Sequence, residues 1–99
     1  MLYLILAEDR PGSLENRMAV RPQHLERLKH LQSLGRLVLA GPLPAIDSPD
    51  PGPTGFTGSL IVAEFDSREK ALAWAKEDPY EKAGIYASIS VSPFKKVLP

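Results

Sequence analysis

The chain has 99 residues, and we expect them to form one domain, residues 1–99. Twelve lysines and arginines balance twelve aspartates and glutamates, so the net charge is zero and no nucleic-acid partner is expected. The absence of cysteine excludes disulfides, iron–sulfur clusters and a cysteine nucleophile. No apolar run approaches the roughly 18 residues that a membrane span requires. The N-terminus also lacks a basic segment typical of signal peptides, so we expect a cytoplasmic protein without a membrane partner.

The first predicted element is a strand over residues 2–7, which is apolar on both faces and is followed by a Pro-Gly turn. A short helix is predicted over residues 14–19. Pro22 is expected to stop or bend this helix, because proline lacks the N–H that continues the hydrogen-bond pattern. A second, amphipathic helix is predicted over residues 23–34, with Gly35 as its C-cap.

A proline-rich segment follows the second predicted strand, residues 37–40. Half of the ten prolines lie between Pro42 and Gly58. Proline cannot donate a backbone hydrogen bond, so we expect neither a regular helix nor a central strand in this segment. The sequence therefore predicts a loop over residues 42–58 that proline makes rigid.

The C-terminal half repeats the order of strand, helix and strand. A strand with two apolar faces is predicted over residues 59–65, and a helix follows that Asp66 or Ser67 can cap. The last strand, residues 85–92, alternates, which places Tyr86 on its polar face with the serines. Pro93 is expected to end this strand, and the apolar residues of the C-terminal tail are expected to dock.

The predicted order βαββαβ is the ferredoxin-like α+β arrangement, in which helices cover one face of a four-stranded antiparallel sheet. The strands at residues 2–7 and 59–65 are nevertheless apolar on both faces. An apolar sheet face that no helix covers indicates an interface. We therefore expect a homodimer in which the second faces of two sheets pack together.

The candidate for chemistry among the two histidines is His24. It lies four and seven residues before Leu28 and Leu31, so it shares their buried helix face and needs a hydrogen-bond partner. One reading is a histidine that is only structural, and the other is a general acid or base held by a carboxylate. The sequence leaves that carboxylate open among five residues: Asp9, Asp47, Asp50, Asp66 and Asp78.

Metal and nucleotide sites are not supported. His24 and His30 are six residues apart on opposite helix faces, so they cannot hold one ion together. The glycine-rich segment 52–58 lacks the Lys-Ser/Thr ending of a phosphate-binding loop. We therefore expect no metal and no nucleotide cofactor.

Short segments along nearly the whole chain resemble the YciI family when they are taken together and in order. They are Met1-Leu2-Tyr3, Ser13-Leu14-Glu15, Arg21-Pro22 with His24-Leu25, Gly35-Arg36-Leu37, Ala40-Gly41-Pro42, Gly55-Phe56-Thr57-Gly58-Ser59, Ala63-Glu64-Phe65, Asp78-Pro79-Tyr80, Ala83-Gly84 and Pro93-Phe94-Lys95-Lys96-Val97. The resemblance implies a dimeric α+β barrel. It also implies an active-site pair of histidine and aspartate, and the matching positions are His24 and Asp78.

The first functional hypothesis is a small enzyme that needs no cofactor, since related barrels include cofactor-free isomerases and monooxygenases. His24 would act as general acid or base on a small cyclic or phenolic substrate in a lyase, isomerase or hydrolase reaction, and Asp78 would orient it. Tyr80 or Tyr86 would bind a substrate oxygen.

Gly41 and Pro42 would form a wall of the cavity in that enzyme. The alternative hypothesis is a dimeric small-molecule-binding or accessory protein without catalysis. In that case the His–Asp hydrogen bond is only structural.

Overall fold

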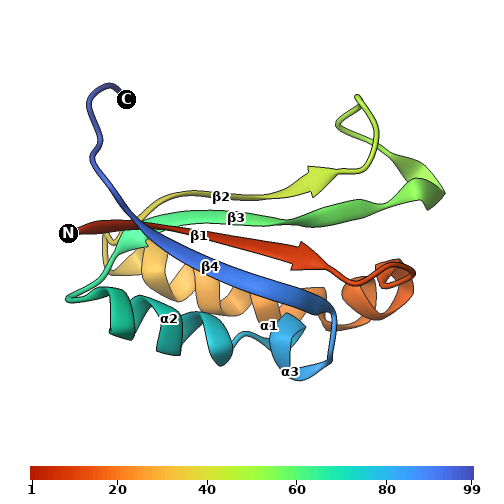
Figure 1. Ribbon diagram of the computed structural model, residues 1–99, viewed down its shortest axis with the longest axis horizontal. Coiled ribbons are helices and arrows are strands. Elements are labelled where there is room, and N and C mark those ends of the chain that lie inside the picture. The colour runs from red at the N-terminus through yellow and green to blue at the C-terminus, as the bar shows by residue number, and fades with distance from the viewer.

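The computed structural model describes all 99 residues and has the predicted ferredoxin-like order. The four strands form one antiparallel sheet in the order β2-β3-β1-β4, and the helices cover one face of it (Figure 1). The elements are β1 (Leu2–Asp9), α1 (Leu14–Ser33), β2 (Leu37–Pro44), the 3₁₀ turn η1 (Gly52–Thr54), β3 (Phe56–Glu64), α2 (Arg68–Lys76), α3 (Pro79–Lys82) and β4 (Tyr86–Phe94).

The core lies between the sheet and the helices. Alternate residues of the central strands point toward α1 and α2, because side chains in a strand alternate between its faces. The main core cluster consists of Tyr3, Ile5, Leu28, Leu31, Ile61, Ala63, Phe65, Ala71, Ala75 and Val91. A second cluster of Ala7, Tyr80, Ile85 and Tyr86 lies where α3 meets the sheet.

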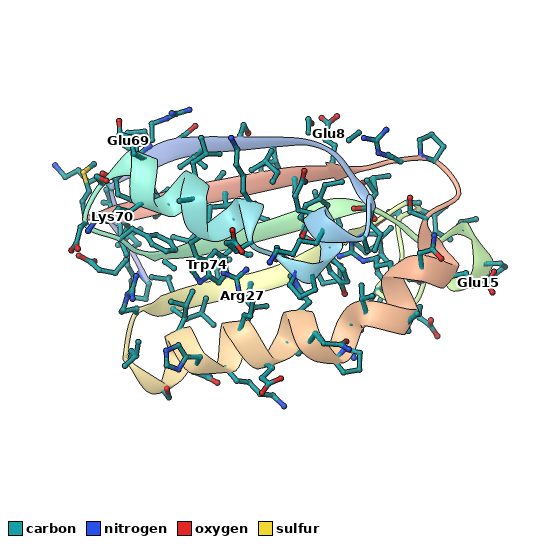
Figure 2. The ribbon with its side chains drawn as sticks, turned by 90° about the horizontal axis from the view of Figure 1, so that it is seen from below. Glu8, Glu15, Arg27, Glu69, Lys70 and Trp74 are labelled. Atoms are coloured by element: carbon teal, nitrogen blue, oxygen red, sulfur yellow. The ribbon has the colours of Figure 1, made fainter.

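The two longer helices are joined across their shared groove by Arg27 and Trp74. Figure 2, viewed from the helix side, shows Arg27 of α1 next to Trp74 of α2. The Arg27 guanidinium donates to the carbonyl oxygen of Trp74 at 2.8 Å and lies 4.3 Å from the centre of the indole ring. This contact adds a cation–π interaction to the apolar packing of the helices on the sheet.

The expected helix break at Pro22 is wrong, because α1 is one continuous helix with Pro22 inside it. Proline there removes a backbone donor. The buried residues on one face of α1 lie on both sides of Pro22, from Arg17 to Leu31, and anchor both halves to the sheet. Packing against the rest of the molecule outweighs the local cost of the proline.

The loop predicted over residues 42–58 is also shorter than expected. Strand β2 continues through Gly41 and Pro42 to Pro44, and β3 begins at Phe56, so residues 56–58 belong to a central strand. The prolines of β2 are tolerated because β2 is an edge strand, where a missing donor breaks no ladder on the outer side. The connection that remains spans residues 45–55.

The alternation predicted for the last strand fails at its start. Glu8 pairs with Ser88 but Asp9 pairs with Tyr86, so Ala87 has no partner residue in this irregular stretch. Such an extra residue reverses the faces of the residues before it. Tyr86 therefore points toward the helices and is 4% exposed, instead of lying with the serines. Pro93, expected to end the strand, lies inside β4, which is the other edge strand.

The sheet face opposite the helices has no covering element (Figure 1). Leu2, Leu4 and Leu6 of β1 are half-buried on this face, and Leu39 of β2 is 51% exposed. The C-terminal tail extends away from the sheet on this side and leaves Val97 79% exposed, so the expected docking of the tail is wrong. None of the helices has the length and apolar character needed to cross a membrane.

Candidate functional site

His24 of α1 and Asp78 meet in the groove between α1 and α3, although they are 54 positions apart in sequence. Nδ1 of His24 lies 2.9 Å from each carboxylate oxygen of Asp78. Because both oxygens are acceptors, the histidine donates from Nδ1–H, which leaves the lone pair on Nε2. His24 is 6% exposed and Asp78 is 2% exposed, so the interaction is shielded from solvent.

The start of helix α3 fixes the Asp78 carboxylate. Asp78 is the N-cap of this helix and Pro79 is its first residue, an order that suits a helix start. The Asp78 carboxylate accepts the backbone N–H of Tyr80 at 2.9 Å. The Tyr80 ring in turn stacks on the His24 imidazole, with ring centres 4.0 Å apart and planes inclined by 17°. The imidazole is therefore held at its edge by Asp78 and on its face by Tyr80.

A second buried ionic cluster lies on the other side of Tyr80. The Arg17 guanidinium donates to both carboxylate oxygens of Asp9, at 2.9 and 2.8 Å, and to the Ser59 hydroxyl at 2.6 Å. The side chains of Arg17 and Asp9 are each 4% exposed. The guanidinium carbon also lies 4.5 Å from the centre of the Tyr80 ring and 5.5 Å from that of Phe56. Arg17 is thus fixed by a carboxylate, a hydroxyl and two aromatic rings.

Residues 17 and 24 are seven positions apart on α1, which is about 10.5 Å along a helix axis. That spacing leaves room for the Tyr80 ring to contact both side chains. The two ionic groups are therefore linked through one aromatic ring.

A cavity of about 310 Å³ opens beside these groups, between α1 and the strands β2 and β3. His24, Arg17 and Tyr80 contribute its polar groups together with Arg21 and Ser59. The rest of the lining is mostly apolar and comes from Met18, Leu25, Leu28, Ala40, Gly41, Pro42, Phe56, Leu60 and Ile61. A mostly apolar cavity with a few converging polar groups is typical of a small-molecule site.

Burial changes the acidity of three groups at this site. It raises the pKa of Tyr80, while the nearby charges of Arg17 and Arg21 act in the opposite direction. Burial raises the pKa of Tyr86 more strongly, an effect that the nearby Ser59 hydroxyl and the charge of Arg17 only partly offset. Burial also raises the pKa of Asp9, which the contact with Arg17 only partly offsets. Both tyrosines are therefore neutral phenols at neutral pH.

The structure brings most of the predicted site residues together. His24, Tyr80, Gly41 and Pro42 line the cavity, and Asp78 lies behind His24. Tyr86 does not line the cavity. It lies behind Tyr80, with an edge-on ring contact at 5.8 Å between centres.

The sequence reasoning missed Arg17, Arg21 and Ser59. A signal for the two arginines is present in α1, because residues 17, 21, 24 and 28 recur at the spacing of one helix face. Charged residues on the buried face of an amphipathic helix indicate a polar site. Ser59 carries no comparable signal. No cluster of three or more His, Cys, Asp or Glu side chains is placed to hold a metal ion.

Comparisons with known proteins agree with this architecture. The family model described as the YCII-related domain matches residues 1–95. Protein YciI from Escherichia coli O6:H1 is 60% identical over 97 residues, which cover 98% of this chain and 99% of that protein. Derivative of benzaldehyde biosynthesis cluster protein C from Emericella nidulans is 36% identical over 83 residues, covering 83% of this chain and 85% of that protein.

A similar solved structure is that of 5-chloro-2-hydroxyhydroquinone dehydrochlorinase from Burkholderia phenoliruptrix AC1100, in complex with 2,5-dihydroxybenzoquinone. It superposes with a TM-score of 0.83 and 34% sequence identity, covering 96% of this chain and 94% of that one. The similarity extends over the strands and helices that carry the cavity.

Proposed function

Because the chain belongs to the YCII-related domain family, with structural similarity to a small-molecule enzyme, we propose that it is a small enzyme that uses His24 and Asp78 for general acid–base chemistry. The substrate is a small cyclic or phenolic compound bound in the cavity beside His24. The reaction is of the lyase, isomerase or hydrolase type and uses no cofactor.

The observation that carries this proposal is the position of His24 between a buried carboxylate and an open cavity. Nδ1 is occupied by Asp78 while the imidazole lines the cavity. The unprotonated Nε2 is then the atom available to a bound molecule. A histidine oriented by a carboxylate in this way is a general base whose charged form the carboxylate stabilises.

In the proposed step, Nε2 of His24 takes a proton from a hydroxyl or acidic C–H group of the substrate. The electron pair of the broken bond stays on the substrate, and the imidazolium keeps its Nδ1–H on Asp78. The same Nε2–H then returns the proton to another atom of the substrate or to its leaving group. The stacked Tyr80 ring and the N–H that holds Asp78 keep the imidazole in one orientation throughout.

The substrate class is supported by two of the similar proteins. One is a dehydrochlorinase named for a chlorinated hydroxyhydroquinone and solved with a dihydroxybenzoquinone. The other is named for a gene cluster that makes derivatives of benzaldehyde. Substituted six-membered rings are common to both names, and an apolar cavity of about 150 Å³ already holds benzene. The cavity of about 310 Å³ therefore has room for a substituted ring.

The proposal is tested by incubating the protein in D₂O with a panel of small phenols and lactones, including 5-chloro-2-hydroxyhydroquinone. Turnover or deuterium incorporation is followed by NMR. His24→Gln should lower the rate by about 10²–10⁴-fold, the usual share of general acid–base catalysis. His30→Gln is the matched control, because His30 is an exposed histidine on the same helix and should keep full activity. Equal activity of His24→Gln and the control would contradict the proposal.

The alternative function is a dimeric small-molecule-binding or accessory protein without catalysis, and the burial of the dyad favours it. His24 and Asp78 are each under a tenth exposed, as a purely structural hydrogen bond would be. In that case Asp78→Asn lowers the free energy of unfolding by about 1–3 kcal/mol. It would leave ligand affinity unchanged, and the D₂O panel would show no turnover by the wild-type protein.

We further propose that the protein forms a homodimer through the uncovered sheet face. This face carries the half-buried leucines of β1 and the exposed Leu39 of β2. A lysine at position 39 would bury a charge in such an interface, so Leu39→Lys should sediment as a monomer while the wild-type protein sediments as a dimer. Leu34→Lys is the control, because Leu34 is similarly exposed but lies at the end of α1. A monomeric wild-type protein at micromolar concentration would refute the dimer.

A further inference from the structure

The lining of the cavity carries positive charge and no carboxylate. Arg17 and Arg21 both line it, and neither an aspartate nor a glutamate does. The two aspartates of the site lie behind the residues that they pair with: Asp9 behind Arg17, and Asp78 behind His24. A molecule in the cavity therefore meets cationic and neutral groups only.

The charge of Arg17 is already balanced. Its guanidinium pairs with both oxygens of Asp9, and the pair is almost fully buried. The Ser59 hydroxyl accepts a further hydrogen bond from the Arg17 guanidinium. Arg17 is thus held rigidly at the cavity wall, and its contacts are those of a residue that positions Tyr80.

Arg21 differs from Arg17 because it has no partner. It is exposed, forms no ion pair and no side-chain hydrogen bond, and still lines the cavity. It lies on α1 one turn before His24, close enough to Tyr80 for its charge to act on the phenol. Arg21 is therefore the uncompensated cation at the mouth of the site.

We propose that the cavity selects the anionic form of a ring-shaped substrate, with Arg21 as the residue that pairs with its oxyanion. The inference rests on the proposed small-molecule function and names the substrate class: an aromatic or cyclic body with a conjugated carboxylate, phenolate or enolate oxygen. The apolar side chains of Leu25, Leu28 and Phe56 hold the ring. A guanidinium forms two parallel hydrogen bonds to a carboxylate, which gives orientation as well as attraction, and a charge-assisted hydrogen bond to a phenolate or enolate oxygen.

The charge distribution also makes binding of a cationic substrate unfavourable. A cationic ligand would meet Arg21 without a lining carboxylate to offset the repulsion. A neutral ring would gain the apolar contacts but leave the charge of Arg21 unused. The anion gains both the apolar contacts and the pairing with Arg21, and the same cavity is lined by His24.

The test compares benzoate with benzamide, which has nearly the same shape but no charge. Binding to the wild-type protein is measured by calorimetry and by the NMR shifts of the His24 ring, which report whether the ligand enters the cavity. Benzoate should bind more tightly than benzamide. Arg21→Gln should weaken benzoate binding about three- to tenfold, as expected for a partly solvated ion pair, and leave benzamide binding unchanged.

Lys29→Gln is the matched control, because Lys29 is an exposed cation on the same helix and does not line the cavity. It should leave the affinity of both probes unchanged. The inference is overturned if benzamide binds as tightly as benzoate, if Arg21→Gln weakens both probes equally, or if neither probe shifts the His24 ring.

These results are separate from the test of catalysis. Benzoate binding needs no turnover, so the preference for anions would stand even if His24→Gln kept full activity. Conversely, turnover that depends on His24 and prefers uncharged substrates would support the enzyme and refute the role of Arg21.

Discussion

Replacing Arg17 with methionine would leave the Asp9 carboxylate buried without its partner. The pair is almost fully buried, with each side chain 4% exposed, and the guanidinium contacts both oxygens of Asp9. Methionine keeps most of the length and apolar volume of arginine, so the variant removes mainly the charge and its hydrogen bonds. The Ser59 hydroxyl loses its donor at the same time.

Removal of one partner from a buried ion pair costs about 3–5 kcal/mol. Small domains have a total free energy of unfolding of about 5–15 kcal/mol, so this loss is a large share. For a domain of this size each kcal/mol shifts Tm by roughly 4–8 °C, which gives a fall of roughly 12–40 °C for Arg17→Met.

The loss should depend on pH in a defined direction. Burial already raises the pKa of Asp9 in the folded protein above its reference value of 3.8. A carboxyl group whose folded pKa is raised binds its proton more tightly when folded, so its contribution to stability falls as pH rises through that pKa. Arg17→Met removes both influences that lower the pKa of Asp9, namely the charge and the hydrogen bonds of Arg17. The pH range over which protonation of Asp9 changes stability therefore extends to higher pH. The variant should therefore be weakest at neutral pH and recover part of its stability toward about pH 5.

Urea unfolding followed by the fluorescence of Trp74, the single tryptophan, measures these differences. Trp74 packs on Phe65 and Arg27, so its emission reports the loss of the core. The double variant Asp9→Asn with Arg17→Met removes the unpaired charge and should recover part of the lost stability. A loss below about 1 kcal/mol, or a loss that is the same at every pH, would refute the assignment of a buried pair.

Four further substitutions test three other features by the same unfolding assay. Tyr86→Phe removes a buried hydroxyl that makes no hydrogen bond of ordinary geometry, and it should leave stability unchanged or raise it by up to about 1 kcal/mol. A clear loss of stability would indicate that the Tyr86 hydroxyl is hydrogen-bonded to Ser59. Gly58→Ala should lower the free energy of unfolding by at least about 2 kcal/mol, because the added Cβ would overlap the Ala7 carbonyl oxygen. Gly41→Ala is the control and should be nearly neutral, because no atom lies within 4 Å of a Cβ added there. Pro22→Ala should gain about 1–3 kcal/mol by restoring a donor inside α1, and a loss would mean that the helix depends on the fixed proline geometry.

The sequence was sufficient for the element order and the sheet, because periodicity is a local property. The short apolar run of residues 2–7 predicts a strand with two apolar faces without knowledge of any partner strand. The irregularity opposite Asp9 could not be predicted in the same way, since it exists only in the pairing of β1 with β4. The sheet face predicted for Tyr86 was therefore wrong, because the pattern was offset by one residue at the irregularity.

The same distinction applies to the site. Helical spacing placed His24 on the buried face of α1, but its carboxylate lies 54 residues away and came only from the family resemblance. The contact of Arg17 with Ser59 spans 42 residues, and the sequence around Ser59 carries no pattern that indicates it. At Pro22 the error has the opposite cause. The local preference of proline predicted a break in the helix, but the packing of α1 against the rest of the molecule keeps the helix continuous.

The prolines in β2 and β4 have a consequence for how copies of this protein meet. These are the two edge strands of the sheet, and β2 contains Pro42 and Pro44 while β4 contains Pro93. An edge without a full row of N–H groups is a poor template for another strand, so end-on growth into a continuous intermolecular sheet or fibril is disfavoured. The homodimer proposed above would instead use the uncovered sheet face, where pairing of two copies would bury the leucines of β1 and leave no such face for a third copy.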